Sequence, residues 1–256
     1  MTTAPARRPR GVLALVALYV LFAALFAGLI ALGSWQVQRR AWKLDLIQRV
    51  EARVHAPPGA PPARTDWSTV SAARDEYRHV RLSGRYLPGR DTYTQAVTEL
   101  GPGYWLLSPF RTEGGEIVLV NRGFVRERRP AAPSSAGEVT GLLRLSEPGG
   151  GFLRRNAPAQ ERWHSRDVAA IAAARGLDGA AVAPYFVDAD RTPGADAGPA
   201  QEPVGGLTVI KFPNNHLVYA LTWFGLALMV AGAAWRVALE QRRRRRAAPP
   251  PTDEVR

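Results

Sequence analysis

A histidine and two aromatic residues near the C-terminal end are spaced to share one face of a helix. His216, Tyr219 and Trp223 lie three and four residues apart, directly after Asn214 and Asn215. Asparagine favours a helix start, so we expect His216 in the first helical turn. The positive end of the helix dipole disfavours an imidazolium there, which keeps a ring nitrogen available as a metal ligand. The alternative is an interfacial aromatic belt whose histidine bonds to lipid headgroups.

A second cluster of polar and aromatic side chains lies near the N-terminal end. It combines an indole, an amide and several cations within about two helical turns: Trp35, Gln36, Arg39, Arg40 and Lys43. Such a set can hold a planar amphipathic anion by stacking and by charge-assisted hydrogen bonds to its carboxylates. A membrane anchor at the lipid–water interface is the alternative.

Each cluster adjoins an apolar stretch that predicts a membrane-spanning helix. Residues 11–33 and 214–236 are almost wholly apolar, and about 20 such residues cross a bilayer core. Both clusters face the middle of the chain, so we expect them at the same membrane surface. A helical spacing continues beyond the first span to about Glu51, which predicts an interfacial extension over residues 34–55. This spacing connects Leu32, Trp35, Arg39, Trp42 and Leu46.

The distribution of charge predicts the topology. The formal net charge is +12, and arginines stand both before the first span and after the second, where residues 242–246 are all arginine. Basic residues mark the cytoplasmic side, so both tails (1–10 and 237–256) are expected inside and the middle exported. Arg39, Arg40 and Lys43 oppose this locally, although a long domain translocates largely regardless of its charge. The basic run is expected to bind anionic membrane lipid and not nucleic acid, because no aromatic residues interleave with it.

The first span is expected to be a retained anchor in a bacterial cell (inner) membrane. Its apolar part is longer than that of a signal peptide, and the ten residues before it are too short for a transit peptide. The chain has no cysteine, which excludes disulfides, thiolate metal sites and CxxC redox pairs. No nucleotide-binding or hydrolase motif is present, so no enzyme is indicated.

The middle of the chain predicts a β-rich domain. A proline-rich linker (56–76) precedes a segment in which apolar and polar residues alternate, as in a half-buried strand. Its apolar residues are Val80, Leu82 and Tyr86. Further strands are expected at 91–97, 104–111, 116–121, 138–145, 185–188 and 207–212. One helix is expected after Ser165 as its N-cap, and Asn121-Arg122-Gly123 reads as a turn. The predicted fold is therefore a membrane protein in which two transmembrane α-helices flank an exported α+β domain (77–213) with a mainly antiparallel β barrel or sandwich.

Four motifs in order resemble the surfeit-locus-one family of cytochrome c oxidase assembly factors. The resemblance spans nearly the whole chain and rests on residues 32–43 (LGSWQVQRRAWK), 101–109 (GPGYWLLSP), 120–123 (VNRG) and 214–224 (NNHLVYALTWF). One departure occurs at Phe124-Val125-Arg126, where the family more often has Trp-Val-Pro.

The resemblance implies a non-enzymatic assembly factor for the haem–copper oxidase, acting on its large catalytic subunit with other assembly factors. It also implies that haem a is a transient cargo with His216 as the ligand of its iron. In this hypothesis Trp35 and Trp223 pack the macrocycle beside Gln36 and Tyr219, and Arg39, Arg40 or Lys43 pairs with the propionates. The alternative function is a haem-free scaffold that holds oxidase subunits together during assembly.

Overall fold

The computed structural model describes residues 10–129, 137–151, 153–191, 203–208, 210 and 212–247. The predicted tail before Arg10 and nearly all of the predicted loop from Thr192 to Pro203 lie outside these ranges. The chain divides into a helical unit (1–47 and 212–256) and a β unit (48–211).

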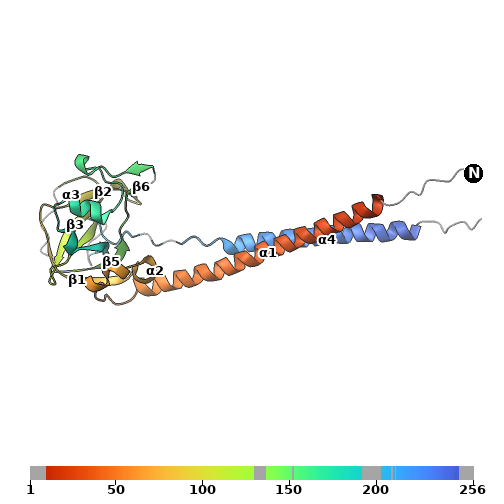
Figure 1. Ribbon diagram of the computed structural model, residues 1–256, viewed down its shortest axis with the longest axis horizontal. Coiled ribbons are helices and arrows are strands. Elements are labelled where there is room, and N and C mark those ends of the chain that lie inside the picture. Colours follow the sequence, from red (N-terminus) through yellow and green to blue (C-terminus); the bar gives the residue numbers. More distant parts are fainter. Residues whose placement is uncertain are drawn as a thin grey trace, which may run out of the picture. The chain divides into compact units, whose positions relative to one another are not determined.

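The helical unit consists of two long helices, α1 (Arg10–Val54) and α4 (His216–Ala247). α1 continues through the predicted extension and on into the β unit, and α4 carries the arginine run on its last turns. Both helices are long and apolar enough to cross a membrane. Within the unit they lie side by side and run antiparallel (Figure 1).

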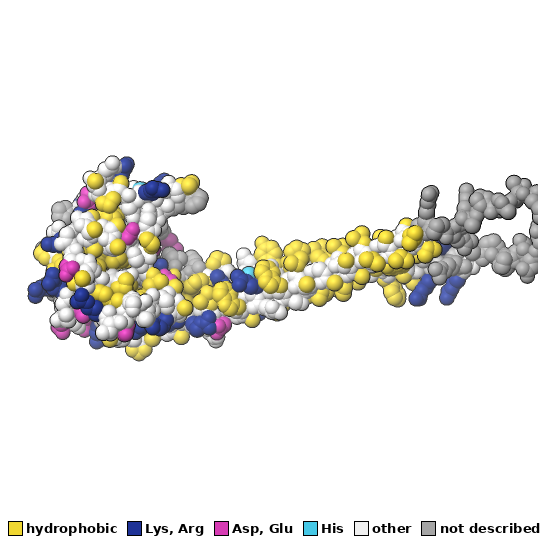
Figure 2. All heavy atoms as spheres, in the orientation of Figure 1, with side chains coloured by type: hydrophobic (Ala, Val, Ile, Leu, Met, Phe, Trp, Pro, Cys, Tyr) yellow, Lys and Arg dark blue, Asp and Glu magenta, His cyan; other side chains and the backbone are white. Residues whose placement is uncertain are grey.

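Apolar side chains cover the outer surfaces of both helices (Figure 2). Val12, Leu13, Val20, Leu228 and Met229 are each more than half exposed. A water-soluble protein rarely leaves so continuous an apolar surface uncovered. This apolar surface is suited to contact with the acyl chains of lipids, and the chain is a membrane protein.

The contact between α1 and α4 depends on small residues. Ala220 and Ala227 of α4 are buried, as is Leu29 of α1. Gly33 lies so close to Phe224 that a Cβ atom at Gly33 would stand 2.5 Å from the phenyl ring. Small residues allow helix backbones to approach closely in a membrane, where packing drives helix association.

The β unit is a closed barrel, which confirms the predicted fold class. Its strands are β1 (His79–Tyr86), β2 (Thr92–Thr98), β3 (Gly101–Thr112), β4 (Ile117–Val125), β5 (Glu138–Leu145) and β8 (Val182–Ala189). The order β1-β5-β8-β4-β3 closes through a further pairing of β3 with β1, and β2 extends β3 at the other end. All these pairings are antiparallel except that of β4 with β8.

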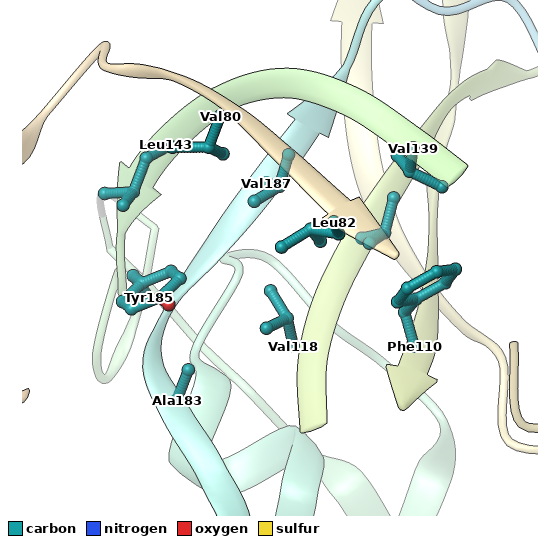
Figure 3. Packing of buried hydrophobic residues seen from close by; sticks show 10 residues of the cluster. Val80, Leu82, Phe110, Val118, Val139, Leu143, Ala183, Tyr185 and Val187 are labelled. Carbon is teal, nitrogen blue, oxygen red and sulfur yellow. The ribbon is translucent and has the colours of Figure 1, made fainter. Parts of the chain in front are cut away.

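The barrel is filled by branched and aromatic side chains (Figure 3). Val80 and Leu82 point inward, as the alternating pattern predicted, and half-buried Tyr86 packs against them. The edge of the Tyr86 ring meets Phe110, with centroids 5.0 Å apart. The rest of the interior consists of Val118, Val120, Val139, Leu143, Ala183, Tyr185 and Val187. Burial raises the pKa of the Tyr185 phenol to about 12.

A second apolar layer covers the outside of β3, β4 and β8. Helix α3 (Val168–Ala174) buries Val168, Ile171 and Ala172 against these strands, as predicted, together with Trp163. The predicted cap was wrong: Asp167 is the N-cap, and its Oδ1 accepts a hydrogen bond from Ala170 N at 3.1 Å. The Ser165 hydroxyl is instead engaged by the Asn156 amide.

The structure adds short elements that the sequence pattern did not predict. They are a 3-10 helix (Arg64–Thr69), α2 (Ala72–Asp75), the two-residue strands β6 (Gly150–Gly151) and β7 (Arg154–Arg155), and 3-10 turns at Pro158–Gln160 and Gly179–Ala181. The strand predicted at 207–212 was wrong for the described residues of that segment. Just before it, Val204 and Phe124 exchange two backbone hydrogen bonds, and the Gly206 amide donates to the Ala189 carbonyl of β8.

The prediction of a turn at Asn121-Arg122-Gly123 was also wrong. These residues lie inside β4, where Leu106 pairs with Gly123 and Leu107 with Asn121, so Arg122 forms a bulge. Gly123 has φ +132°, and a Cβ atom there would stand 2.3 Å from the Val204 backbone. The bulge and the Val204 contact both require this glycine.

Replacing Gly123 with alanine should therefore destabilise the β unit. Strain at positive φ costs on the order of 1–3 kcal/mol, and the clash with a backbone adds to it. Thermal unfolding of the full chain, followed by tryptophan fluorescence, should show a clearly lower midpoint. Gly179→Ala is the matched control, because a Cβ atom at Gly179 meets nothing within 4 Å. Equal midpoints for both variants would contradict this account.

A buried polar cluster connects several strands near the bulge. Asp188 accepts hydrogen bonds from Asn121 (2.7 Å), Arg144 (3.1 Å), Arg166 (3.1 Å) and Thr208 (3.0 Å). The Asp188 side chain is only 4% exposed. Burial alone would lower the pKa of Arg166, but the charges of Asp188 and Glu147 outweigh it and raise that pKa. The arginine therefore stays charged at every physiological pH.

Candidate functional site

The structure joins the two sequence clusters by a hydrogen bond. Nδ1 of His216, at the first residue of α4, lies 2.7 Å from Oε1 of Gln36 on α1. Both residues belong to the helical unit and both are partly buried. Asn215 holds the position before the helix, and its carbonyl accepts a hydrogen bond from Tyr219 N at 3.3 Å.

This hydrogen bond determines which imidazole nitrogen is available. An amide oxygen can only accept, so Nδ1 of His216 carries the proton and donates it to Gln36. In the neutral ring, Nε2 then holds the free lone pair. Metal-binding histidines are oriented in the same way, by an acceptor on the nitrogen that does not bind the metal. The bond to Gln36 thus leaves Nε2 as the ring nitrogen that could bind a ligand.

Two buried polar atoms without a partner in the described part of the chain lie on α4 and directly before it. Trp223 Nε1 and Asn214 Oδ1 are buried without a hydrogen-bond partner among the described residues. A buried donor or acceptor left unpaired is costly. An amphipathic ligand beside His216 would offer such atoms polar partners.

Two of the predicted cations lie beside aromatic rings. The Arg39 guanidinium lies 4.7 Å from the centroid of the Trp42 ring, and Lys43 Nζ lies 5.3 Å from that of Phe212. Arg40 and Lys43 follow Gln36 at helical spacing and are partly buried like it.

The predicted aromatic residues of the site differ in their exposure. Trp35 is 51% exposed and Tyr219 is 55% exposed, whereas Trp223 is partly buried. His216 therefore meets the face of α1 that carries Gln36, while Trp35, Arg39 and Tyr219 remain exposed. Their predicted roles toward a ligand stay predictions.

The described residues contain no group of three or more histidine and acidic side chains that could hold a metal ion. A zinc site of ordinary composition needs three or four protein ligands. A metal that already carries most of its ligands would need only one imidazole from the protein. Haem is such a group, and a single oriented histidine fits it.

The family model described as the SURF1 family matches residues 23–228. The chain belongs to the SURF1 family. This match confirms the family indicated by the sequence motifs, and it includes both halves of the His216–Gln36 contact. The first matched residue lies inside α1 and the last inside α4.

Curated relatives support the same family assignment along most of the chain. Surfeit locus protein 1 of Xenopus tropicalis is 34% identical over 220 residues, which cover 77% of this chain and 67% of that protein. The mouse (Mus musculus) protein of that name is 35% identical over 219 residues, with coverage of 76% and 67%. The human (Homo sapiens) protein is 34% identical over 221 residues, with coverage of 77% and 69%.

The sequence motifs indicated Gln36 and His216 as site residues, but not the residues that bring them together. Gly33 and Phe224 form the close approach of the helices. The sequence feature that could have indicated this contact is the helical spacing of Leu29, Gly33 and Gln36. These residues share a face of α1 that lies next to the face with Trp35 and Trp42.

Proposed function

We propose that this SURF1-family protein is a non-enzymatic assembly factor for haem–copper cytochrome c oxidase. It binds haem a and delivers it to the large catalytic subunit, working with other assembly factors. The observation that carries the proposal is the His216–Gln36 hydrogen bond, which leaves Nε2 of His216 as the nitrogen that would bind the iron.

The surroundings of His216 support an amphipathic cargo. Apolar helix surfaces suit a macrocycle, and the cations of α1 suit its propionates. Arg40 and Lys43 share the helix face of Gln36 and are the best placed of these cations. Haem itself supplies the redox-active iron, and the protein's part is to orient one imidazole and to pair the carboxylates.

The membrane topology is part of the proposal. The protein crosses the inner membrane of a bacterial cell twice. Both tails lie in the cytoplasm, and the β unit lies on the outer side of this membrane. The flanking arginines support this orientation through the positive-inside rule. His216 and Gln36 then lie near the outer surface of that membrane.

The visible spectrum of protein purified from cells that make haem a tests this function. A Soret band that co-purifies with the full chain is the expected result. Two results together would instead favour the haem-free scaffold. The protein would show no Soret band, and it would still co-purify with the large oxidase subunit when haem synthesis is blocked.

Replacing Gln36 with leucine should weaken haem retention without unfolding the protein. The variant removes the acceptor that fixes the proton on Nδ1, and loss of such an outer partner typically costs roughly 10- to 100-fold in metal affinity. The rate of haem transfer to apomyoglobin measures the effect.

Two control variants separate the hydrogen bond from helix packing. Gln36→Glu keeps an acceptor for Nδ1 and should retain haem more strongly than Gln36→Leu. Gln38→Leu alters an exposed amide two residues away and should leave the transfer rate unchanged. Equal rates for Gln36→Leu and wild type would remove Gln36 from the site.

A further inference from the structure

The β unit carries a cationic cleft of about 550 Å³ beside its edge strand β2. Polar side chains line it from β2, β3, the end of β4, the β6–β7 hairpin and the segment before α3: Gln95, Tyr104, Arg126, Arg154 and His164. None of the described residues that line it is acidic. The volume lies within the range of small-molecule sites, and the lining suits an anion.

In a neighbouring cleft of similar size, acidic side chains lie among the arginines. It has a volume of about 480 Å³ and contains Arg128, Arg129 and Arg175, but also Asp91 and Glu161. Arg175 binds Glu161 at 2.5 Å, and this hydrogen bond lowers the pKa of the glutamate. Carboxylates therefore share that second cleft with its arginines, whereas none of the described residues that line the first cleft is acidic.

Exposed aliphatic side chains stand at the cationic cleft. Among the described residues of the β unit, Val97 and Leu153 are the large hydrophobic residues that are mostly exposed, at 86% and 90%. Val97 lines the cleft, and Leu153 directly precedes Arg154 in the hairpin. Arg155 follows and is exposed. An isolated apolar side chain needs no explanation, but both of these lie at one cationic site.

We propose that this surface docks onto the membrane. The docking surface consists of Val97, Leu153, Arg154 and Arg155. The cleft binds the phosphate of an anionic phospholipid, and the two aliphatic side chains enter the acyl region next to it. Arginine forms charge-assisted hydrogen bonds with phosphate, and each basic residue at an anionic membrane surface adds to the attraction.

The connection of the β unit to the membrane favours a lipid over a soluble anion. The unit is joined at both ends to helices that are able to cross a membrane, so a bilayer is always present at high effective concentration. A soluble phosphate would use the arginines but leave Val97 and Leu153 in water. A lipid uses both parts of the docking surface.

A single-site probe can test the docking directly, because the chain contains no cysteine. Leu153→Cys in the full chain is labelled with an environment-sensitive fluorophore and reconstituted in nanodiscs. The discs contain phosphatidylcholine alone, or phosphatidylcholine with phosphatidylglycerol. We expect a blue shift and quenching by acyl-labelled nitroxide lipid only with phosphatidylglycerol. Glu113→Cys, in the turn beyond the opposite end of β3, is the control site and should show neither.

Charge variants test which residues recognise the lipid. Arg154→Gln with Arg155→Gln should reduce the docked-to-free ratio roughly fivefold for each arginine. The matched control is Arg85→Gln with Arg111→Gln, a pair of exposed arginines facing each other across β1 and β3. That control loses the same charge and should dock like the parent.

Three results would overturn the proposal. One is the absence of quenching in both lipid compositions. Another is equal quenching in both, which would indicate apolar adsorption without recognition of the headgroup. The third is a blue shift produced by inorganic phosphate in discs of phosphatidylcholine alone, which would assign the cleft to a soluble anion.

Discussion

His216→Ala should abolish the Soret band of protein purified from cells that make haem a. The variant removes the imidazole that we propose as the haem ligand, whose Nδ1 lies 2.7 Å from Oε1 of Gln36. The axial ligand largely decides how haem iron is held. The loss should therefore exceed the roughly 10- to 100-fold effect of an outer-shell change such as Gln36→Leu.

Chemical rescue distinguishes a ligand from a packing residue. His216→Gly leaves space at the start of α4, and free imidazole added to this variant should restore the Soret band. His55→Ala is the control, because this exposed histidine directly follows α1 and its Nδ1 lies 2.9 Å from the Glu51 carbonyl oxygen. An unchanged Soret band in His216→Ala, with normal helix content by circular dichroism, would exclude His216 as the ligand.

The elements best predicted from the sequence are those with long regular patterns. The apolar stretches of α1 and α4 and the alternation of β1 require no knowledge of distant partners. The hairpin between β3 and β4 follows from Gly114-Gly115 between two β-rich runs. Closure of the barrel was not predictable, because it depends on β3 being long enough to pair with β2 near one end and β1 near the other.

The helix face was the main gap in the prediction of the site. Aromatic spacing pointed to the face with Trp35 and Trp42, but both indoles are about half exposed. In a membrane, large apolar side chains gain nothing by leaving lipid, so small residues and polar groups mark the helix contact instead. Gly33 and Gln36 fit that rule. The rule for soluble proteins, in which large apolar residues mark the buried face, selects Trp35 and Trp42 instead.

The buried polar cluster of the β unit was also not predictable from local sequence. Asp188 reads as the polar residue that ends a strand, and Asn121-Arg122-Gly123 reads as a turn. Only the pairing of β8 with β4 and β5 brings Asp188 to Asn121 and Arg144. Such contacts depend on register, which a single sequence does not specify.

Asp188→Ala should destabilise the β unit more than any surface change. The carboxylate accepts hydrogen bonds from two arginines, an asparagine and a threonine that come from separate segments. Removing it leaves Arg144 and Arg166, each no more than 16% exposed, without their shared counter-ion. Breaking a buried ion pair on one side typically costs about 3–5 kcal/mol.

Urea unfolding of the full chain, followed by the fluorescence of buried Trp163, measures this loss. Glu127→Ala removes a carboxylate whose ion pair with Arg129 is mostly exposed, so it should cost no more than about 1 kcal/mol. Asp188→Asn should be intermediate, because the amide oxygen still accepts hydrogen bonds although the charge is gone. A loss for Asp188→Ala no larger than that for Glu127→Ala would show that the arginines find other partners.

The position of Asp188 connects this stability to the arrangement of the chain before α4. Thr208 donates a hydrogen bond to the Asp188 carboxylate at 3.0 Å, and Val204 pairs with Phe124 close to the Arg122 bulge. The cluster therefore holds the last described segment of the β unit against β4 and β8. Loss of the carboxylate should release this segment, so protease sensitivity near Thr208 should rise in Asp188→Ala before global unfolding begins. Unaltered protection there would separate the segment's attachment from the buried cluster.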